Sequence, residues 1–255
     1  MTTRSLREAL STGKPLLGAW LQMPNPVAAE AVGYLGFDWV GIDTQHGLIG
    51  YETLLSMLQA VAISGTPAVV RVSGNVPGEI GRALDSGAQG IIVPLVETAE
   101  AAAQAADACR YPPRGHRSWG ALRPALQSVP FTPDVGDEQA VCFAMVETVT
   151  GVENIDAIAA VEGVDVVYIG PSDLASSAGL PPMLALKEES HRHLVECIAA
   201  ACSKAGKWSG IHPPSPDVGW YKDQGFNLLP VYRDLPALQE GAVASLDTAR
   251  ASAGL

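Results

Sequence analysis

The chain has 255 residues, of which 47% are hydrophobic and 17% are charged, and it carries a formal net charge of −11. This balance predicts a globular chain and excludes wholesale disorder. With only 16 lysines and arginines, the sequence offers no basic surface for phosphates, so we expect no nucleic-acid partner. No secretion signal and no apolar run of membrane-spanning length stand out, so we expect no membrane partner and a cytoplasmic location.

Short apolar runs typical of buried strands recur along the chain, with helical patterns between them. They lie at residues 16–20, 38–42, 68–72, 90–95, 141–146, 164–170, 207–211 and 227–231. Strands that alternate with helices indicate parallel pairing through right-handed crossovers. No glycine-rich phosphate loop of a nucleotide-binding fold follows the first run. We therefore predict the α/β class, with residues 1–255 forming a single (β/α)₈ TIM barrel domain.

One connection is much longer than the others. It covers about 112–140 and is rich in Pro, Gly and Arg. Connections of this length are uncommon unless they have a function, so we predict a lid or a subunit-contact loop. The clearest helix start follows soon after, in TVTGVENIDAIAAV, where Thr150 and Glu153 have the spacing of a capping box.

Polar side chains follow several of the predicted strands, at the end where barrel enzymes carry their chemistry. Asp43 and His46 follow the second strand, and Arg71 ends the third. Glu147 follows the fifth strand, and Asp173 follows the sixth. Taken alone, such an Asp is most often a helix cap and such an Arg a surface ion pair. Five of these residues on one rim favour a functional site.

The carboxylates of Glu147 and Asp173 are expected on adjacent strand ends, where they repel unless a proton or a cation lies between them. We predict that they hold a divalent metal ion, namely Mg²⁺, Mn²⁺ or Co²⁺, because an all-oxygen ligand set suits hard cations. In the run GPSDL, which begins at Gly170, the backbone N–H groups of Ser172 and Leu174 are candidates for binding a substrate carboxylate.

The remaining rim residues are suited to acid–base chemistry. Arg71 supplies a permanent positive charge for an enolate oxygen or a carboxylate of the substrate. His46 is a proton acceptor near neutral pH, and Asp43 would orient it by accepting its ring N–H. We therefore predict that all three residues are catalytic, with Arg71 also binding substrate.

Other basic residues carry weaker signals. His191 and His193 stand two apart on a helix and face different directions, which predicts a solvated face and no metal site. His212 follows the seventh strand, where a position at the rim of the site and an ordinary loop position are both open. Lys207 begins that strand, at the opposite end of the barrel, which disfavours a Schiff-base mechanism.

Several stretches together resemble the HpcH/HpaI family of class II, metal-dependent pyruvate aldolases, of the 4-hydroxy-2-oxo acid aldolase type. They are DWVGIDTQHG, VVRVSGN, RALDSGAQGIIVPLVETAEAA, RYPPRGHRS and AMVETVTGVENIDAIAAVEGVDVVYIGPSDLA. The resemblance runs from about Leu6 to about Ala244. It implies a (β/α)₈ barrel with a divalent ion held by Glu147 and Asp173, and a pyruvate keto oxygen contacted by Arg71.

The resemblance also implies an assembly. Asp85, in ALDSGAQG, matches a family aspartate that reaches the site of a neighbouring subunit, and we count it among the catalytic candidates. Family members are commonly hexamers built as trimers of dimers, whose C-terminal helices are exchanged between subunits. We therefore expect a homo-oligomer.

Two departures from the family pattern concern the pocket. Met145 stands where the family often has a glutamine that can hydrogen-bond to a substrate. The last strand ends in LLPVYRDLP, where a run of small residues closing on an aspartate is more usual. Both departures bear on which acceptor aldehyde the pocket prefers.

The function expected from the resemblance is reversible aldol cleavage of 4-hydroxy-2-oxo acids to pyruvate and an aldehyde through a metal-stabilised enolate. Two alternatives stay open. One is a related barrel lyase that acts on acyl-CoA thioesters or phosphoenolpyruvate-type substrates, which the lack of a basic patch for the CoA phosphates disfavours. The other is a non-catalytic keto-acid binding protein, for which Met145 is the supporting feature.

Overall fold

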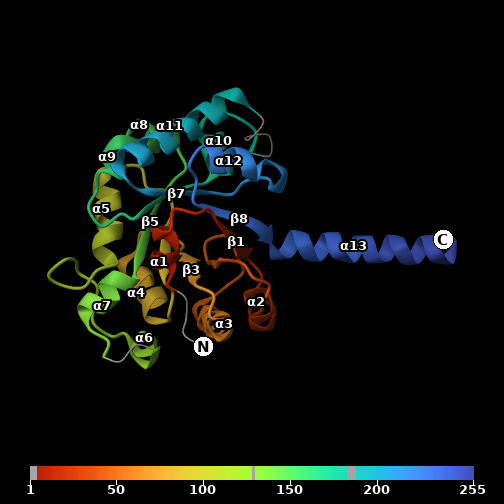
Figure 1. Ribbon diagram of the computed structural model, residues 1–255, viewed down its shortest axis with the longest axis horizontal. Helices are drawn as coiled ribbons and strands as arrows, with labels where there is room; N and C mark the ends of the chain where they lie inside the picture. The colour runs from red at the N-terminus through yellow and green to blue at the C-terminus, as the bar shows by residue number, and fades with distance from the viewer. Residues whose placement is uncertain (1–4, 128–129, 183–187) are drawn as a thin grey trace.

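The computed structural model describes residues 5–127, 130–182 and 188–255. Eight parallel strands pair in chain order, and β1 pairs with both β2 and β8, so the sheet closes into a barrel (Figure 1). The strands are β1 (Leu16–Leu21), β2 (Trp39–Asp43), β3 (Ala68–Arg71), β4 (Gly90–Val93), β5 (Val141–Val146), β6 (Val166–Ile169), β7 (Trp208–Ile211) and β8 (Leu228–Arg233). Each strand overlaps a predicted run, and the predicted barrel is confirmed.

Helices connect the strands and cover the outside of the barrel. They are α2 (Pro26–Gly33), α3 (Tyr51–Ser64), α4 (Pro77–Asp85), α5 (Ala99–Ala108), α8 (Val149–Glu153), α9 (Ile155–Ala159), α10 (Pro171–Ser177), α11 (Glu189–Ala205) and α12 (Val218–Asp223), with a 3₁₀ turn at Ser215–Asp217. Further helices are α1 (Leu6–Ser11), α6 (Leu122–Gln127), α7 (Pro133–Gln139) and α13 (Asp234–Ala253). Within the described residues, no helix is both long and apolar enough to cross a membrane.

The cap of α8 differs from the prediction. Thr148, not Thr150, is the N-cap, and its side chain accepts a hydrogen bond from the N–H of Gly151 at 3.1 Å. The chain therefore turns into the helix directly after Glu147, so that Thr150 already lies in the first turn. The proposed capping box between Thr150 and Glu153 is thus wrong by two residues.

The barrel interior is filled by large side chains. Trp20, Trp39, Phe143 and Tyr168 lie fully buried there, and Leu6 and Leu10 of α1 belong to the same cluster. Glycines make room for the rings. A Cβ on Gly41 would lie 2.4 Å from the ring of Trp20, and a Cβ on Gly210 would lie 2.5 Å from the ring of Tyr168. These side chains fill the interior of the barrel. A substrate cavity can therefore open only at the ends of the strands.

The long connection 112–140 is not structureless, because it contains the short helices α6 and α7. It is tied to the barrel by Arg117, whose guanidinium donates to Asp85 at 2.6 Å and lies over the ring of Tyr111. None of its described residues lines the main pocket. A lid or subunit-contact role for this connection stays a prediction.

The last helix, α13, is set apart from the rest of the fold. Figure 1 shows it running away from the barrel as a single helix that ends at the C-terminus. Asp234, its first residue, is the one buried position in it. Several apolar side chains along it are exposed, namely Leu235, Leu238, Val243 and Leu246.

Candidate active site

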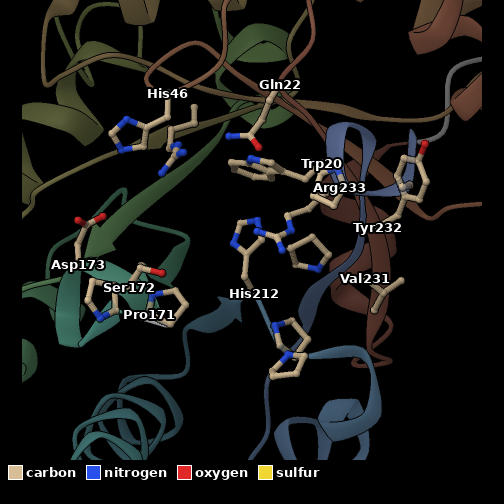
Figure 2. Close-up of a pocket in the computed structure, with 18 of the residues that line it drawn as sticks. Trp20, Gln22, His46, Pro171, Ser172, Asp173, His212, Val231, Tyr232 and Arg233 are labelled. Atoms are coloured by element: carbon tan, nitrogen blue, oxygen red, sulfur yellow. The ribbon is translucent and has the colours of Figure 1, made fainter. Parts of the chain in front are cut away.

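A pocket of about 550 Å³ opens at the C-terminal ends of the strands. Residues at the ends of all strands except β4 line it, which is the arrangement expected for a barrel enzyme. Figure 2 shows His46, Asp173, Ser172 and Pro171 on one side of the pocket, with Trp20 and the residues of β8 on the other. The sequence-predicted rim residues His46, Arg71, Gly170, Ser172 and Asp173 are among those that line it.

Asp43, the last residue of β2, is fully buried and is the centre of a hydrogen-bond network. Arg71 forms a two-pronged ion pair with it, from Nε to Oδ1 at 2.9 Å and from Nη2 to Oδ2 at 2.5 Å. Four more N–H groups donate to the same carboxylate: those of the Trp20 ring, the Gln22 amide and the backbones of Gln45 and His46. Burial raises the pKa of Asp43, but the bonds and charge of Arg71 outweigh it and leave the pKa below 3.8.

The predicted link between Asp43 and the ring of His46 is wrong. His46 reaches Oδ1 of Asp43 through its backbone N–H, at 3.2 Å. The ring is not the donor because both carboxylate oxygens are already occupied by Arg71 and the other N–H groups. Asp43 therefore orients Arg71 and the loop that carries His46, while the imidazole itself faces the pocket.

Glu147 has one oxygen without a partner in a buried position. Its side chain is 1% exposed, Oε1 accepts the N–H of Leu95 at 2.8 Å, and Oε2 has no hydrogen-bond partner within the described residues. Burial raises the pKa of Glu147 most, the Leu95 N–H partly offsets this, and Asp173 raises it further, to about 7. A Cβ on Gly170 would lie 2.1 Å from Oε2, so a glycine is needed beside this oxygen.

These features fit a divalent cation. A buried carboxylate oxygen without a partner, next to the carboxylate of Asp173, is stabilised by a positive charge between the two. Over the part of the chain that the structure describes, no cluster of three or more His, Cys, Asp or Glu residues forms a metal cage. Glu147 and Asp173 would thus be the protein ligands, and further positions would be open to water and substrate, as suits Mg²⁺ or Mn²⁺ better than zinc.

The run GPSDL forms a helix start and not an open loop. Pro171 is the first residue of α10, and the N–H of Leu174 donates to the carbonyl oxygen of Gly170 at 3.0 Å. Leu174 is therefore not available to a substrate, and that part of the prediction is wrong. Ser172 lies in the first turn, where helix N–H groups have no intrahelical acceptor, so it remains a candidate.

His191 was wrongly placed on a solvated face. It is fully buried, and its Nε2 lies 3.0 Å from the carbonyl oxygen of Pro171, at the start of the helix that carries Asp173. Burial lowers its pKa, which keeps the ring neutral. The signal was present in the sequence, because His191, Val195 and Ile198 have the i, i+4, i+7 spacing of a buried helix stripe.

Other pocket residues carry no motif that sequence reasoning could use. Trp20, Gln22 and Arg233 line the pocket, and so does His212. Of the two positions left open for His212, the rim of the site is correct. Met145 is almost fully buried and adds an apolar thioether to the wall next to Gly170.

Asp85 is not part of the pocket within one chain. It is the last residue of α4, and its carboxylate pairs with Arg117. The residues that line the pocket do not include it. Any catalytic role of Asp85 therefore requires a second subunit.

The chain belongs to the HpcH/HpaI aldolase/citrate lyase family, whose model matches residues 16–227. It is 36% identical to a hydroxypyruvate/pyruvate aldolase of Rhizorhabdus wittichii, over 96% of this chain and 98% of that protein. It is 37% identical to a 5-keto-4-deoxy-D-glucarate aldolase of Klebsiella pneumoniae, over 90% of each protein. The crystal structure of an HpcH/HpaI aldolase from Desulfitobacterium hafniense superposes with a TM-score of 0.89, at 26% identity and 96% coverage of both chains.

These similarities bear directly on the expectations from sequence. The predicted family, the barrel and the class of enzyme, an aldolase, are confirmed. Aldolases of this family generally depend on a divalent metal ion. That dependence agrees with the neighbouring carboxylates of Glu147 and Asp173 described above.

Proposed function

We propose that this protein is a metal-dependent aldolase that reversibly cleaves 4-hydroxy-2-oxo acids to pyruvate and an aldehyde. The observation that carries the proposal is the unpartnered Oε2 of buried Glu147, which lies beside Asp173 in the pocket that also holds Arg71. Glu147 and Asp173 would bind Mg²⁺, Mn²⁺ or Co²⁺. When bound, such an ion acts as a Lewis acid that polarises the 2-keto group.

Arg71 would stabilise the enolate oxygen that develops during cleavage. Asp43 fixes its Nε and Nη2, so the guanidinium is held in one orientation before substrate arrives. Its Nη1 makes no hydrogen bond with another described residue, and Arg71 lines the pocket. A donor fixed in advance stabilises developing charge without reorganisation during the reaction.

His46 would act as the general base. In cleavage it accepts the proton of the C4 hydroxyl, the C3–C4 bond breaks, and the electron pair remains on C3 as the enolate of pyruvate. The new carbonyl of the aldehyde forms at C4, and protonation of C3 completes pyruvate. Ser172 and Gly170 would contact the carboxylate of the substrate.

The proposed assembly is a hexamer built as a trimer of dimers, with α13 exchanged between subunits and Asp85 of one chain completing the site of another. The exposed apolar side chains of α13 support it, because an isolated helix buries too little apolar surface to be stable alone. The exposed row includes Leu238 and Leu246.

Exchange of the pyruvate methyl protons for deuterium, followed by NMR, tests the proposed function without knowledge of the aldehyde. Metal-stripped protein should exchange only after addition of Mg²⁺, Mn²⁺ or Co²⁺, and Glu147→Ala should abolish the exchange. Glu8→Ala removes an exposed carboxylate from α1, at the opposite end of the barrel, and should exchange like the wild type. Absence of exchange with every metal, in folded protein, would refute the proposal and favour a thioester lyase or a keto-acid binding protein.

A further inference from the structure

The two proposed metal ligands are held in different ways. Glu147 is buried, and the N–H of Leu95 fixes one of its oxygens at 2.8 Å. Asp173 is exposed and lies in the first turn of α10, so its position depends on the backbone of that turn and not on the packing of its own side chain. Figure 2 shows Pro171, Ser172 and Asp173 together on one wall of the pocket. A contact that fixes this turn therefore also fixes the second ligand.

The start of α10 lacks the usual local support. The helix has seven residues, and its N-cap is Gly170, which has no side chain to accept the first N–H groups. A helix this short is not stable through its own hydrogen bonds. Its far end is tied to α8, because the N–H of Val149 donates to Oγ of Ser177 at 2.9 Å. The first turn needs a separate anchor.

His191 supplies this anchor from α11. Its side chain is fully buried, and its Nε2 lies 3.0 Å from the carbonyl oxygen of Pro171, two residues before Asp173. A carbonyl oxygen only accepts hydrogen bonds, so the single N–H of the neutral ring must be at Nε2 and donate to Pro171. The donor is carried by a 17-residue helix that also buries Val195 and Ile198. The start of α10 is thus attached to a long, well-packed element.

The other ring nitrogen shows that stability alone does not explain a histidine at this position. Nδ1 of His191 is buried and has no hydrogen-bond partner among the residues that the structure describes. A buried polar atom without a partner lowers stability, and an apolar side chain of similar size would avoid that loss. The remaining reason for the histidine is the one bond that its ring makes, to the carbonyl oxygen of Pro171.

We propose that His191 is a positioning residue for the metal site: by holding Pro171 it fixes the first turn of α10, so that the carboxylate of Asp173 is in place before the cation binds. The inference rests on the proposed metal-dependent aldolase and adds a residue that does not line the pocket. Without this bond, part of the free energy of metal binding is used to order the turn. The affinity for the metal then falls, whereas the rate at saturating metal does not, because the bound ion restores the position of Asp173.

Two variants of matched length test the proposal. In His191→Met the side chain has no donor, whereas in His191→Gln the amide N–H₂ can occupy the place of Nε2. By calorimetry, His191→Met should bind Mn²⁺ about tenfold more weakly than the wild type, at the lower end of the roughly 10–100-fold loss that follows removal of such an outer partner. His191→Gln should stay within about threefold of the wild type. Exchange of the pyruvate methyl protons in His191→Met should be slow at low Mn²⁺ and should reach the wild-type rate at saturating Mn²⁺.

Controls separate a positioning role from a general loss of packing. His193→Gln changes an exposed imidazole on the same helix and should bind Mn²⁺ like the wild type. Should His191→Met not fold, His191→Asn replaces it, because its amide is one methylene shorter than that of Gln and ends short of Pro171.

Three results would overturn the positioning role while the aldolase stands. They are wild-type Mn²⁺ affinity in the variant without the bond, an equal loss of affinity in His191→Gln, and exchange that stays slow at saturating Mn²⁺. A wild type that neither binds Mn²⁺ nor exchanges the methyl protons would instead refute the proposed metal site, and the role of His191 with it.

Discussion

Replacement of Asp43 by Asn should destabilise the protein strongly, although it changes a single atom. The carboxylate is fully buried and accepts six N–H groups, three at each oxygen. An amide group can satisfy one set of three but turns its own N–H₂ toward the other. Whichever way it faces, Arg71 loses one prong of its ion pair and keeps its charge in a buried site.

The cost follows from that geometry. Removing one partner of a buried ion pair costs about 3–5 kcal/mol because an uncompensated charge is left behind. For a chain of this size each kcal/mol lowers Tm by about 2–4 °C, so the variant should melt about 6–20 °C below the wild type. The pKa of Asp43 is lowered, so the stability it contributes is present above 3.8 and is lost only as the pH falls through the lowered value. The difference between the two proteins should therefore be constant from pH 8 to pH 5.

Urea unfolding at matched protein concentration, at pH 8 and at pH 5, measures this difference. Asp223→Asn is the control, because Asp223 is an exposed carboxylate paired with neighbouring Lys222, and surface changes of this kind cost less than about 0.5 kcal/mol. An Asp43→Asn protein within 1 kcal/mol of the wild type would refute the view that Asp43 exists to compensate and orient Arg71.

Three other predictions concern the metal site and the assembly. In metal-free protein, Glu147→Gln should be stabilising. Burial raises the pKa of Glu147 from 4.5 to about 7, so the stability of the wild type falls as the pH rises through this range. At 1.36 kcal/mol per pH unit, the loss is about 3 kcal/mol. Urea unfolding with chelator should thus show a variant more stable at pH 8 and no advantage below pH 4.5. Gly170→Ala puts a Cβ 2.1 Å from Oε2 of Glu147 and should weaken Mn²⁺ binding at least tenfold by calorimetry, with an unchanged affinity counting against the assigned ligand. Leu238→Glu combined with Leu246→Glu should lower the molar mass measured by light scattering, and a mass equal to the wild type would exclude α13 from the assembly.

The fold could be predicted from the sequence because each strand of the barrel is a short apolar run bounded by helix signals. The run at 141–146 matches β5 residue for residue, and the others are displaced by one or two residues at their ends. Strand ends fixed by hydrogen bonding to neighbours cannot be located from the apolar pattern alone. The position of the site at the carboxyl ends of the strands followed from the barrel itself.

The partners of the site residues could not be predicted in the same way. Position along the chain places Asp43 near His46, but the choice between the ring of His46 and the guanidinium of Arg71 depends on how β2 and β3 pair, with Asp43 opposite Arg71. Leu174 was misjudged because the proline before Ser172 begins a helix, which consumes an N–H that a loop would leave open. Arg233 belongs to no motif, and only the structure places it in the wall of the pocket.

The carboxylate of Asp234 connects the wall of the pocket to the start of α13. Its two oxygens hold the backbone of Gln22 and Met23, beyond the end of β1, and Asp234 is itself the first residue of α13. Residues 230–240 therefore form both a wall of the pocket and the root of the helix that leaves the barrel. If α13 contacts a second subunit as proposed, substitutions in this segment would alter the pocket wall and the subunit contact together.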